Sequence, residues 1–296
     1  MPVAQVMTAF RANLTGKDIY DYNIIRDKNS WAEPLRLSVI VTTYNNPSFL
    51  KKVLDGFFLQ TRMPDEVLIA DDGSGRDTEE IVQEFRRKAS FPVIHVWQED
   101  SGFRLARIRN KAIGRSSGEY IVVIDGDCVI NRYFIADHEF LAERGCFIQG
   151  KRVLVGKNAV SYFDCIHANS FPKLLKMAVN GSLSNVHHLI RLPFRLTMKD
   201  RKLKGIKGCN MSFFRGDIEA VNGYNENFVG WGNEDSELAC RLFKYGLTKK
   251  VHLFMAVCFH LWHRSNKQVS NGNRQLLLET AASKGHYCTN GITRKD

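Results

Sequence analysis

The chain has 296 residues, 44% of them hydrophobic and 25% charged, a composition that is ordinary for a soluble globular protein. This length is enough for one large α/β domain or for a domain with an appended lobe. No apolar run approaches the roughly 20 residues that span a bilayer, no signal-peptide pattern is visible, and seven cysteines without CxxC spacing argue against a disulfide framework or a zinc cluster. The formal net charge of +11 indicates an anionic partner, either nucleic acid, an anionic membrane surface or a phosphorylated substrate.

Strands and helices alternate along the first half of the chain, after a mixed, polar N-terminal extension at residues 1–36. We expect strands at 37–42, 66–70 and 92–97, each followed by a helix, and each strand ends in a cluster of polar residues. This alternation predicts an α/β fold with a doubly wound, mixed but mostly parallel sheet flanked by helices. Ligand is expected outside the carboxyl ends of the strands.

The fourth strand, 120–124, is a short apolar run that predicts burial on both faces, and it stops at Asp125, Gly126 and Asp127. Carboxylates at i and i+2 of an extended segment point to the same side and repel each other unless a cation lies between them. Mn²⁺ or Mg²⁺ prefers such oxygen ligands and keeps positions open for a phosphate. The alternative is an acidic turn without metal.

Two residues at the earlier strand ends suit a nucleotide. Tyr44 can stack on a base, or it can serve as a lid over the edge of the core. The carboxylate of Asp72 can accept a hydrogen bond from a uracil N–H, although Asp-Asp-Gly-Ser also forms ordinary Asx turns.

Residues 157–205 are mostly helical in pattern and increasingly basic, with lysine and arginine between bulky apolar residues. Such a segment is typical of an interface with anionic lipid, and also of a surface helix pair whose apolar side belongs to the core. The last expected strand, 251–259, leads into His260 and His263, which lie far along the chain from the two acids but can complete a metal site with them.

Gly230 and Gly232 flank Trp231, which suggests close backbone approach beside an aromatic platform for a sugar. Glu234 and Asp235 follow in the first turn of the next helix, where the helix dipole favours carboxylates whether or not they have a function.

Taken together, the chain from about Leu37 to Asn266 resembles the family 2 glycosyltransferases with the GT-A fold. The motifs keep the family's order: Thr-Tyr-Asn at a strand end, Asp-Asp-Gly-Ser, Gly-Phe-Arg…Arg-Asn, Asp-Gly-Asp, Gly-Trp-Gly-Asn-Glu-Asp and a terminal histidine. The second half looks closest to the galactosyltransferase and chondroitin-polymerase type. The resemblance implies a GT-A domain at 37–266, with a nucleotide-sugar half at 37–130, an acceptor half at 131–266, and a C-terminal tail at 267–296.

The resemblance also implies an activity, an inverting transfer of a hexosyl or N-acetylhexosaminyl group from a UDP-sugar to a glycan or lipid-linked glycan, with Mn²⁺ or Mg²⁺ as cofactor. By position, the donor would be held by Thr42, Tyr44, Asp72, Arg104, Arg109, Asp125 and Gly126. The metal would be bound by Asp127, with Asp125 completing its shell and His263, or else His260, as the distant ligand. Asp235 falls where the family has its catalytic base, and the acceptor would contact Trp231, Gly232 and Glu234.

Two other functions remain open at this point. A sugar-nucleotide nucleotidyltransferase would need a glycine-rich basic loop after the first strand, and residues 43–46 do not resemble one. A basic nucleic-acid-binding protein fits the charge but not the four acids at the expected site, so no nucleic acid is expected. We therefore expect a cytoplasmic enzyme, in contact with the inner face of the cell membrane if residues 157–205 bind lipid, that acts in bacterial surface polysaccharide or lipopolysaccharide synthesis.

Overall fold

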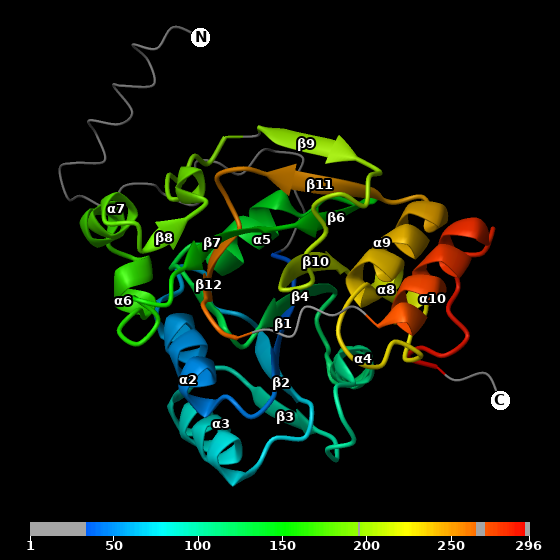
Figure 1. Cartoon of the computed structure of the whole chain (residues 1–296), viewed down its shortest axis with the longest axis horizontal. Helices are drawn as coiled ribbons and strands as arrows, with labels where there is room; N and C mark the ends of the chain where they lie inside the picture. Colours follow the sequence, from blue (N-terminus) through cyan, green and yellow to red (C-terminus); the bar gives the residue numbers. More distant parts are fainter. Residues whose placement is uncertain (1–33, 195, 265–269, 294–296) are drawn as a thin grey trace, which may run out of the picture. The chain divides into compact units, whose positions relative to one another are not determined.

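Two β-sheets form the frame of residues 34–194, 196–264 and 270–293, the part of the chain that this computed structural model describes (Figure 1). The larger sheet contains β1 (Leu37–Thr43), β2 (Glu66–Asp71), β3 (Val93–Trp97), β4 (Tyr120–Asp125), β6 (Cys146–Gln149), β9 (Thr197–Asp200), β10 (Asn210–Phe214) and β11 (Thr248–His252). Its strand order is β3-β2-β1-β4-β10-β6-β11-β9. The smaller sheet has the order β5-β12-β7-β8, with β5 (Cys128–Ile130), β7 (Lys151–Val155), β8 (Leu183–Ser184) and β12 (Val257–Leu261).

The four strands β3, β2, β1 and β4 are parallel, as the strand–helix alternation predicted, and β10 joins them antiparallel to β4. The chain moves outward from β1 to β3 and then returns to the other side of β1 to form β4. The carboxyl ends of β1 and β4 therefore border the point where the direction of the crossovers reverses, which is where open α/β sheets bind ligands. The α/β prediction is confirmed.

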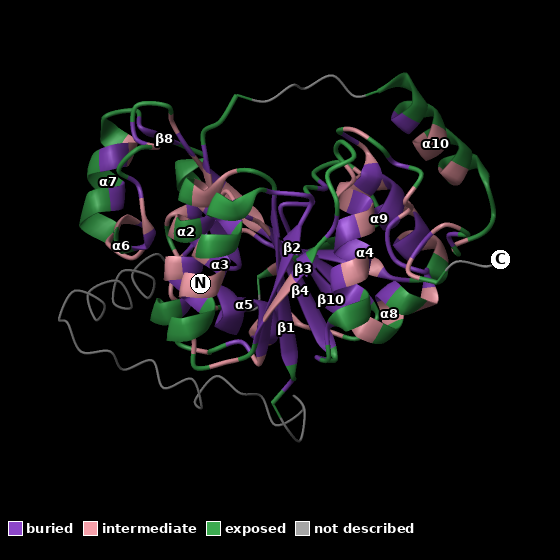
Figure 2. Ribbon diagram, turned by 90° about the horizontal axis from the view of Figure 1, so that it is seen from below, coloured by how far each residue is buried: buried purple, intermediate pink, exposed green. Residues whose placement is uncertain are grey.

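Helices cover both faces of the larger sheet (Figure 2). One face carries α2 (Pro47–Asp55), α3 (Arg76–Lys88) and α5 (Phe134–Leu141), and the other carries α4 (Leu105–Arg115), α8 (Arg215–Ala220) and α9 (Glu234–Tyr245). Apolar side chains of α4, α8 and α9 pack with β1, β2, β4 and β10 into one buried cluster, which fixes where each of these helices begins relative to the strand ends.

The shorter helices are η1 (Gly56–Leu59), α6 (Cys165–Ala168), α7 (Phe171–Val179) and η2 (Val186–His188), and α10 (Asn271–Ala282) packs on α9. The expected N-terminal extension lies outside the described residues except for its end. The expected tail at 267–296 contains α10. Asn46 caps α2: its side chain accepts a hydrogen bond from Phe49 N at 3.2 Å, with Pro47 in the first turn.

Two predictions about secondary structure in the second half are wrong. The segment 157–205 is not mostly helical, since two short helices share it with β8, η2 and β9. The expected strand 251–259 is divided between β11 and β12, which belong to different sheets, and Ala256 between them has a positive φ of 52°. An apolar run gives no sign of such a division, because both strands are equally buried.

Candidate active site

The carboxyl ends of β1 and β4 lie in direct contact. Thr42 and Asp125 are register partners, and Thr42 Oγ1 donates a hydrogen bond of 2.7 Å to Asp125 Oδ1. Gly126 N donates to Thr42 O at 2.7 Å, and a Cβ on Gly126 would lie 2.6 Å from that same oxygen. Only glycine therefore permits the tight turn that carries the chain from Asp125 to Asp127.

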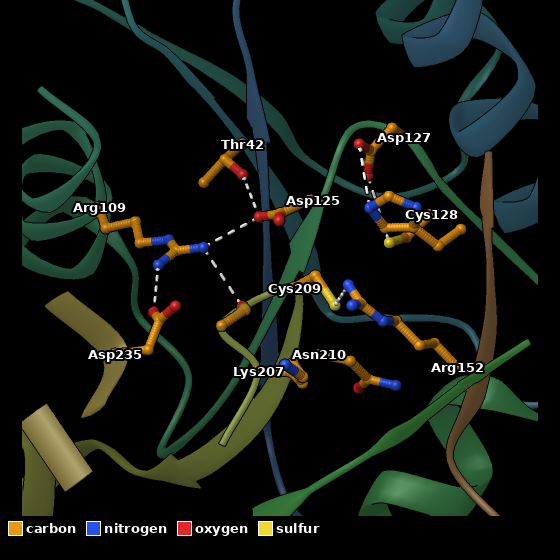
Figure 3. A network of polar contacts seen from close by, with 12 residues as sticks. Thr42, Arg109, Asp125, Asp127, Cys128, Arg152, Lys207, Cys209, Asn210 and Asp235 are labelled. Carbon is orange, nitrogen blue, oxygen red and sulfur yellow. Dashed lines mark hydrogen bonds and ion pairs between the residues drawn. The ribbon is translucent and has the colours of Figure 1, made fainter. Parts of the chain in front are cut away.

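Arg109, on α4, holds Asp125 and Asp235 together (Figure 3). Its side chain is buried, its Nη2 donates to Asp125 Oδ1 at 2.9 Å and to Gly208 O at 3.2 Å, and its Nη1 donates to Asp235 Oδ1 at 2.7 Å. Burial raises the pKa of Asp125 to about 6, although the Arg109 charge works in the opposite direction. The guanidinium thus compensates carboxylates from β4 and from the start of α9.

Asp127 faces two histidines from the end of β12 and just beyond it. Its Oδ2 lies 3.0 Å from His263 Nε2 and 3.4 Å from His260 Nε2. The hydrogen bond with Asp127 raises the pKa of His263, and burial works against it. One carboxylate and two imidazoles, all partly open to solvent, are suitable ligands for a divalent metal ion. The side chains present here therefore fit the metal that the motif implies.

Tyr44, Asp72 and Arg104 lie in the segments that follow β1, β2 and β3. The Asp72 carboxylate is buried, accepts hydrogen bonds from Gln98 Nε2 at 2.6 Å and Arg104 N at 2.7 Å, and has a pKa that burial raises. Tyr44 is exposed, and its hydroxyl donates to Asp100 Oδ2 at 2.9 Å. Its ring is open to stack on a planar group.

The segment before α9 combines an exposed ring with a buried acid. Trp231 is exposed between Gly230 and Gly232, both of which have positive φ. Glu234 is buried, and its Oε2 accepts a hydrogen bond from Gly232 N at 3.1 Å. Burial, and then the neighbouring Asp235, raise the pKa of Glu234 to about 7.

The structure therefore divides the expected site residues into four groups. Arg109 binds Asp125 and Asp235, Asp125 also accepts from Thr42, and the two histidines meet at Asp127. The nucleotide residues follow β1, β2 and β3, and the acceptor residues lie at the start of α9 and just before it. The guanidinium of Arg109 points at carboxylates inside the protein, a role that its spacing in the sequence did not reveal. The sequence also did not predict the role of Gly208. A Cβ at this position would lie 2.0 Å from the Asp235 oxygens, so only glycine leaves room for that carboxylate. A glycine before a short strand does not by itself indicate such a contact.

Comparison with known proteins identifies the class. The model of the glycosyl transferase family 2 matches residues 38–218, and that of the N-terminal domain of galactosyltransferase matches residues 193–264. The chain belongs to glycosyl transferase family 2, as its motifs predicted. This membership favours neither of the two alternative functions.

Among curated relatives, the chain is 27% identical to the hyaluronan synthase of Pasteurella multocida over 85% of its length and 27% of that of the relative. It is also 27% identical to the chondroitin synthase of Escherichia coli, over 71% of this chain and 32% of that one. The chain therefore spans about a third or less of these relatives.

Solved structures share the fold. TarS 1–349 of S. aureus in complex with UDP-GlcNAc matches with a TM-score of 0.60 and 18% identity, over 83% of this chain and 66% of that one. A mannosyltransferase of Pyrobaculum calidifontis in complex with GDP-Man and Mn²⁺ matches with a TM-score of 0.52 and 16% identity, over 93% of this chain and 76% of that one. The GT-A fold expected from the sequence is confirmed.

Proposed function

We propose that this chain transfers a hexosyl or N-acetylhexosaminyl group from a UDP-sugar to a glycan hydroxyl, with inversion and with Mn²⁺ or Mg²⁺ bound. The observation that carries the proposal is the cluster of Asp127, His260 and His263 directly beside the β1–β4 switch point. A metal-ligand set at the place where an open α/β sheet receives a ligand suits a nucleotide diphosphate. The complexes of related folds with UDP-GlcNAc and with GDP-Man and Mn²⁺ support this assignment.

In the proposed site, Asp127 with His263 and His260 would hold the metal, and Asp125 would bind the ribose or complete the metal shell. The metal supplies positive charge for the departing diphosphate. Tyr44 stacks on the uracil, the Asp72 carboxylate accepts from its N–H, and Thr42, Gly126 and Arg104 line the rest of the nucleotide site.

Asp235 is the proposed general base, which removes the proton from the acceptor hydroxyl as its oxygen attacks the anomeric carbon. Arg109 fixes the orientation of that carboxylate through the 2.7 Å bond to Oδ1 and leaves Oδ2 to face the acceptor. Trp231, Gly232 and Glu234 would hold the acceptor sugar, with the exposed indole as the platform. A positioned carboxylate base of this kind accelerates transfer by about 10²–10⁴-fold.

The proposed acceptor is a bacterial surface polysaccharide or lipid-linked glycan at the inner face of the membrane. On α7, Phe171, Leu175 and Val179 follow one another at helical spacing and are 44%, 51% and 83% exposed, with Lys173 and Lys176 beside them. An exposed apolar stripe flanked by lysines suits an anionic bilayer surface. Among the described residues, no helix has the length and apolar character to cross a bilayer.

Sedimentation with vesicles tests the membrane part of the proposal. We expect the protein to bind anionic vesicles at low salt and to lose that binding in Leu175→Glu. Leu278→Glu, a matched change at an exposed leucine on α10, should keep it. Equal binding of both variants would remove α7 from the interaction.

Calorimetric titration of UDP tests the nucleotide–metal site itself. We expect UDP to bind in the presence of Mn²⁺ and EDTA to abolish this binding. Asp127→Ala should weaken the binding by about 10–100-fold or more, because removal of even an indirect metal partner costs about that factor. Asp55→Ala, at an exposed carboxylate on α2, is the matched control and should bind UDP like the wild type. A folded protein that binds no UDP under any of these conditions would contradict the proposal, and GDP and CMP would then be titrated.

A further inference from the structure

The inner side of the Asp127 cluster is lined by sulfur. One carboxylate oxygen of Asp127, the Sγ of Cys128 and a ring nitrogen of His260 all lie within 4.8 Å of one another. The Cys128 thiol also donates to Asp127 Oδ1 at 3.3 Å. Cys128 and His260 are directly opposite each other in the antiparallel β5–β12 pair, so the sheet fixes their separation.

Two further thiols lie behind Cys128. Cys209, just before β10, and Cys258, on β12, interact with Cys128 and with each other, and all three are buried. Arg152 Nη1 lies 3.5 Å from the Cys209 Sγ (Figure 3). The three cysteines are free thiols. The side of the site that faces the protein interior therefore offers thiols, which are soft metal ligands, whereas Asp127 and His263 are partly open to solvent.

This donor set differs from the one that Mn²⁺ or Mg²⁺ prefers. Those ions take oxygen ligands, whereas a set of thiolate, imidazole and carboxylate is typical of Zn²⁺ and Co²⁺. We propose that the cluster also binds a thiophilic divalent ion of the Zn²⁺ class through Cys128, His260 and Asp127. Because Asp127 is shared, such an ion excludes the hard ion that the transfer reaction uses.

Binding replaces one S–H bond by a metal–sulfur bond, and the proton of the Cys128 thiol leaves to the buffer. In the metal-free protein the Cys128 thiol uses this proton in its hydrogen bond to Asp127 Oδ1. The inference rests on the proposed function only in taking Asp127 and His260 as metal ligands, and it can be tested without nucleotide.

Titration of Co²⁺ into the metal-free protein provides the test, because a thiolate bound to Co²⁺ absorbs in the near ultraviolet by charge transfer. We expect this band in the wild type, its displacement by Zn²⁺, and its loss in Cys128→Ser. In competition titrations, Cys128→Ser should lose at least 10-fold in Zn²⁺ affinity and keep its Mn²⁺ affinity within about 2-fold, since removal of indirect partners alone costs about 10–100-fold. Cys146→Ser, a buried cysteine on β6 away from the cluster, is the control and should keep the band.

A band that persists in Cys128→Ser, or that only Cys209→Ser removes, would overturn the assignment. If Cys128→Ser fails to fold, X-ray absorption of the Zn²⁺-loaded wild type decides: a sulfur neighbour at about 2.3 Å supports the proposal, and a shell of nitrogen and oxygen alone overturns it. Absence of the band in a protein that binds UDP with Mn²⁺ would remove only this inference. A band in a protein without UDP affinity would remove the proposed function and leave the soft-metal site.

Discussion

Asp125 and Asp127 are two residues apart on one strand end, yet the protein treats their charges differently. Asp125 is enclosed by Thr42 and the buried Arg109, which also binds Asp235. Asp127 has no guanidinium or ammonium within ion-pair distance among the described residues, and it faces His260 and His263 instead. The Asp125 carboxylate therefore has an internal cation built into the fold, whereas the Asp127 carboxylate faces two imidazoles.

This difference explains how two adjacent acids can coexist. Arg109 stands against three carboxylates, those of Asp125, Asp235 and Glu234, so even the compensated side has surplus negative charge. Burial is the main cause of the raised pKa of both Asp125 and Glu234, and the neighbouring Asp235 charge raises the pKa of Glu234 further. The residues around Arg109 and the residues around Asp127 can therefore be changed separately by mutation.

The largest effect is expected from Asp235→Asn, which keeps the shape of the side chain but removes its basicity. We expect transfer to fall by about 10²–10⁴-fold, because general base catalysis is lost. Mn²⁺-dependent UDP binding should be unchanged, since the Asp127 side is intact. Initial rates and UDP calorimetry on the same sample measure both quantities, and a variant with wild-type turnover would exclude Asp235 as the base.

Next, Arg109→Met should remove the positive charge that compensates the Asp125 and Asp235 carboxylates. Removing one partner of a buried ion pair leaves uncompensated carboxylates, so we expect the free energy of unfolding to fall by about 3–5 kcal/mol in denaturant titrations. Arg76→Met, which removes an exposed pair with Glu80, is the matched control and should cost less than about 1 kcal/mol. Equal losses in the two variants would show that the Arg109 network adds nothing to stability.

The smallest effect concerns pH. Glu234 has a folded-state pKa of about 7, above its usual value of 4.5, so the folded state binds its proton more tightly than the unfolded state does. Stability of the metal-free protein should therefore fall as pH rises from about 5 to 8, by on the order of 1–3 kcal/mol. In Glu234→Gln the slope should be smaller, with Asp125 providing what remains. Thermal unfolding over this pH range measures the slopes, and parallel curves would contradict the assignment to Glu234.

The sequence predicted the parallel half of the fold well. The strands at 37–42, 66–70, 92–97 and 120–124 are found within about a residue or two of their expected ends. The first, second and fourth are buried runs stopped by polar residues, whereas β3 at the edge of the sheet is only partly buried. It was less informative in the second half, where β8 and β9 are short and partly exposed and leave little periodicity to read.

The sequence indicated which residue types form the candidate site, but not which of these side chains contact one another. Asp127 and the two histidines were expected to meet, and the structure brings them within 3.4 Å. The sequence did not predict that Arg109 would turn inward or that Cys128 and Gly208 would lie against the site. These positions depend on tertiary contacts between segments far apart in the chain. No local pattern encodes those contacts.

The division of the last apolar run into β11 and β12 has a consequence for the order of events during synthesis. Asp127 leaves the ribosome long before His260 and His263, which follow it much later in the sequence. The Asp127 cluster cannot close until β12 has been made and has joined the second sheet. Premature termination before β12 would therefore leave Asp127 without its two histidine partners.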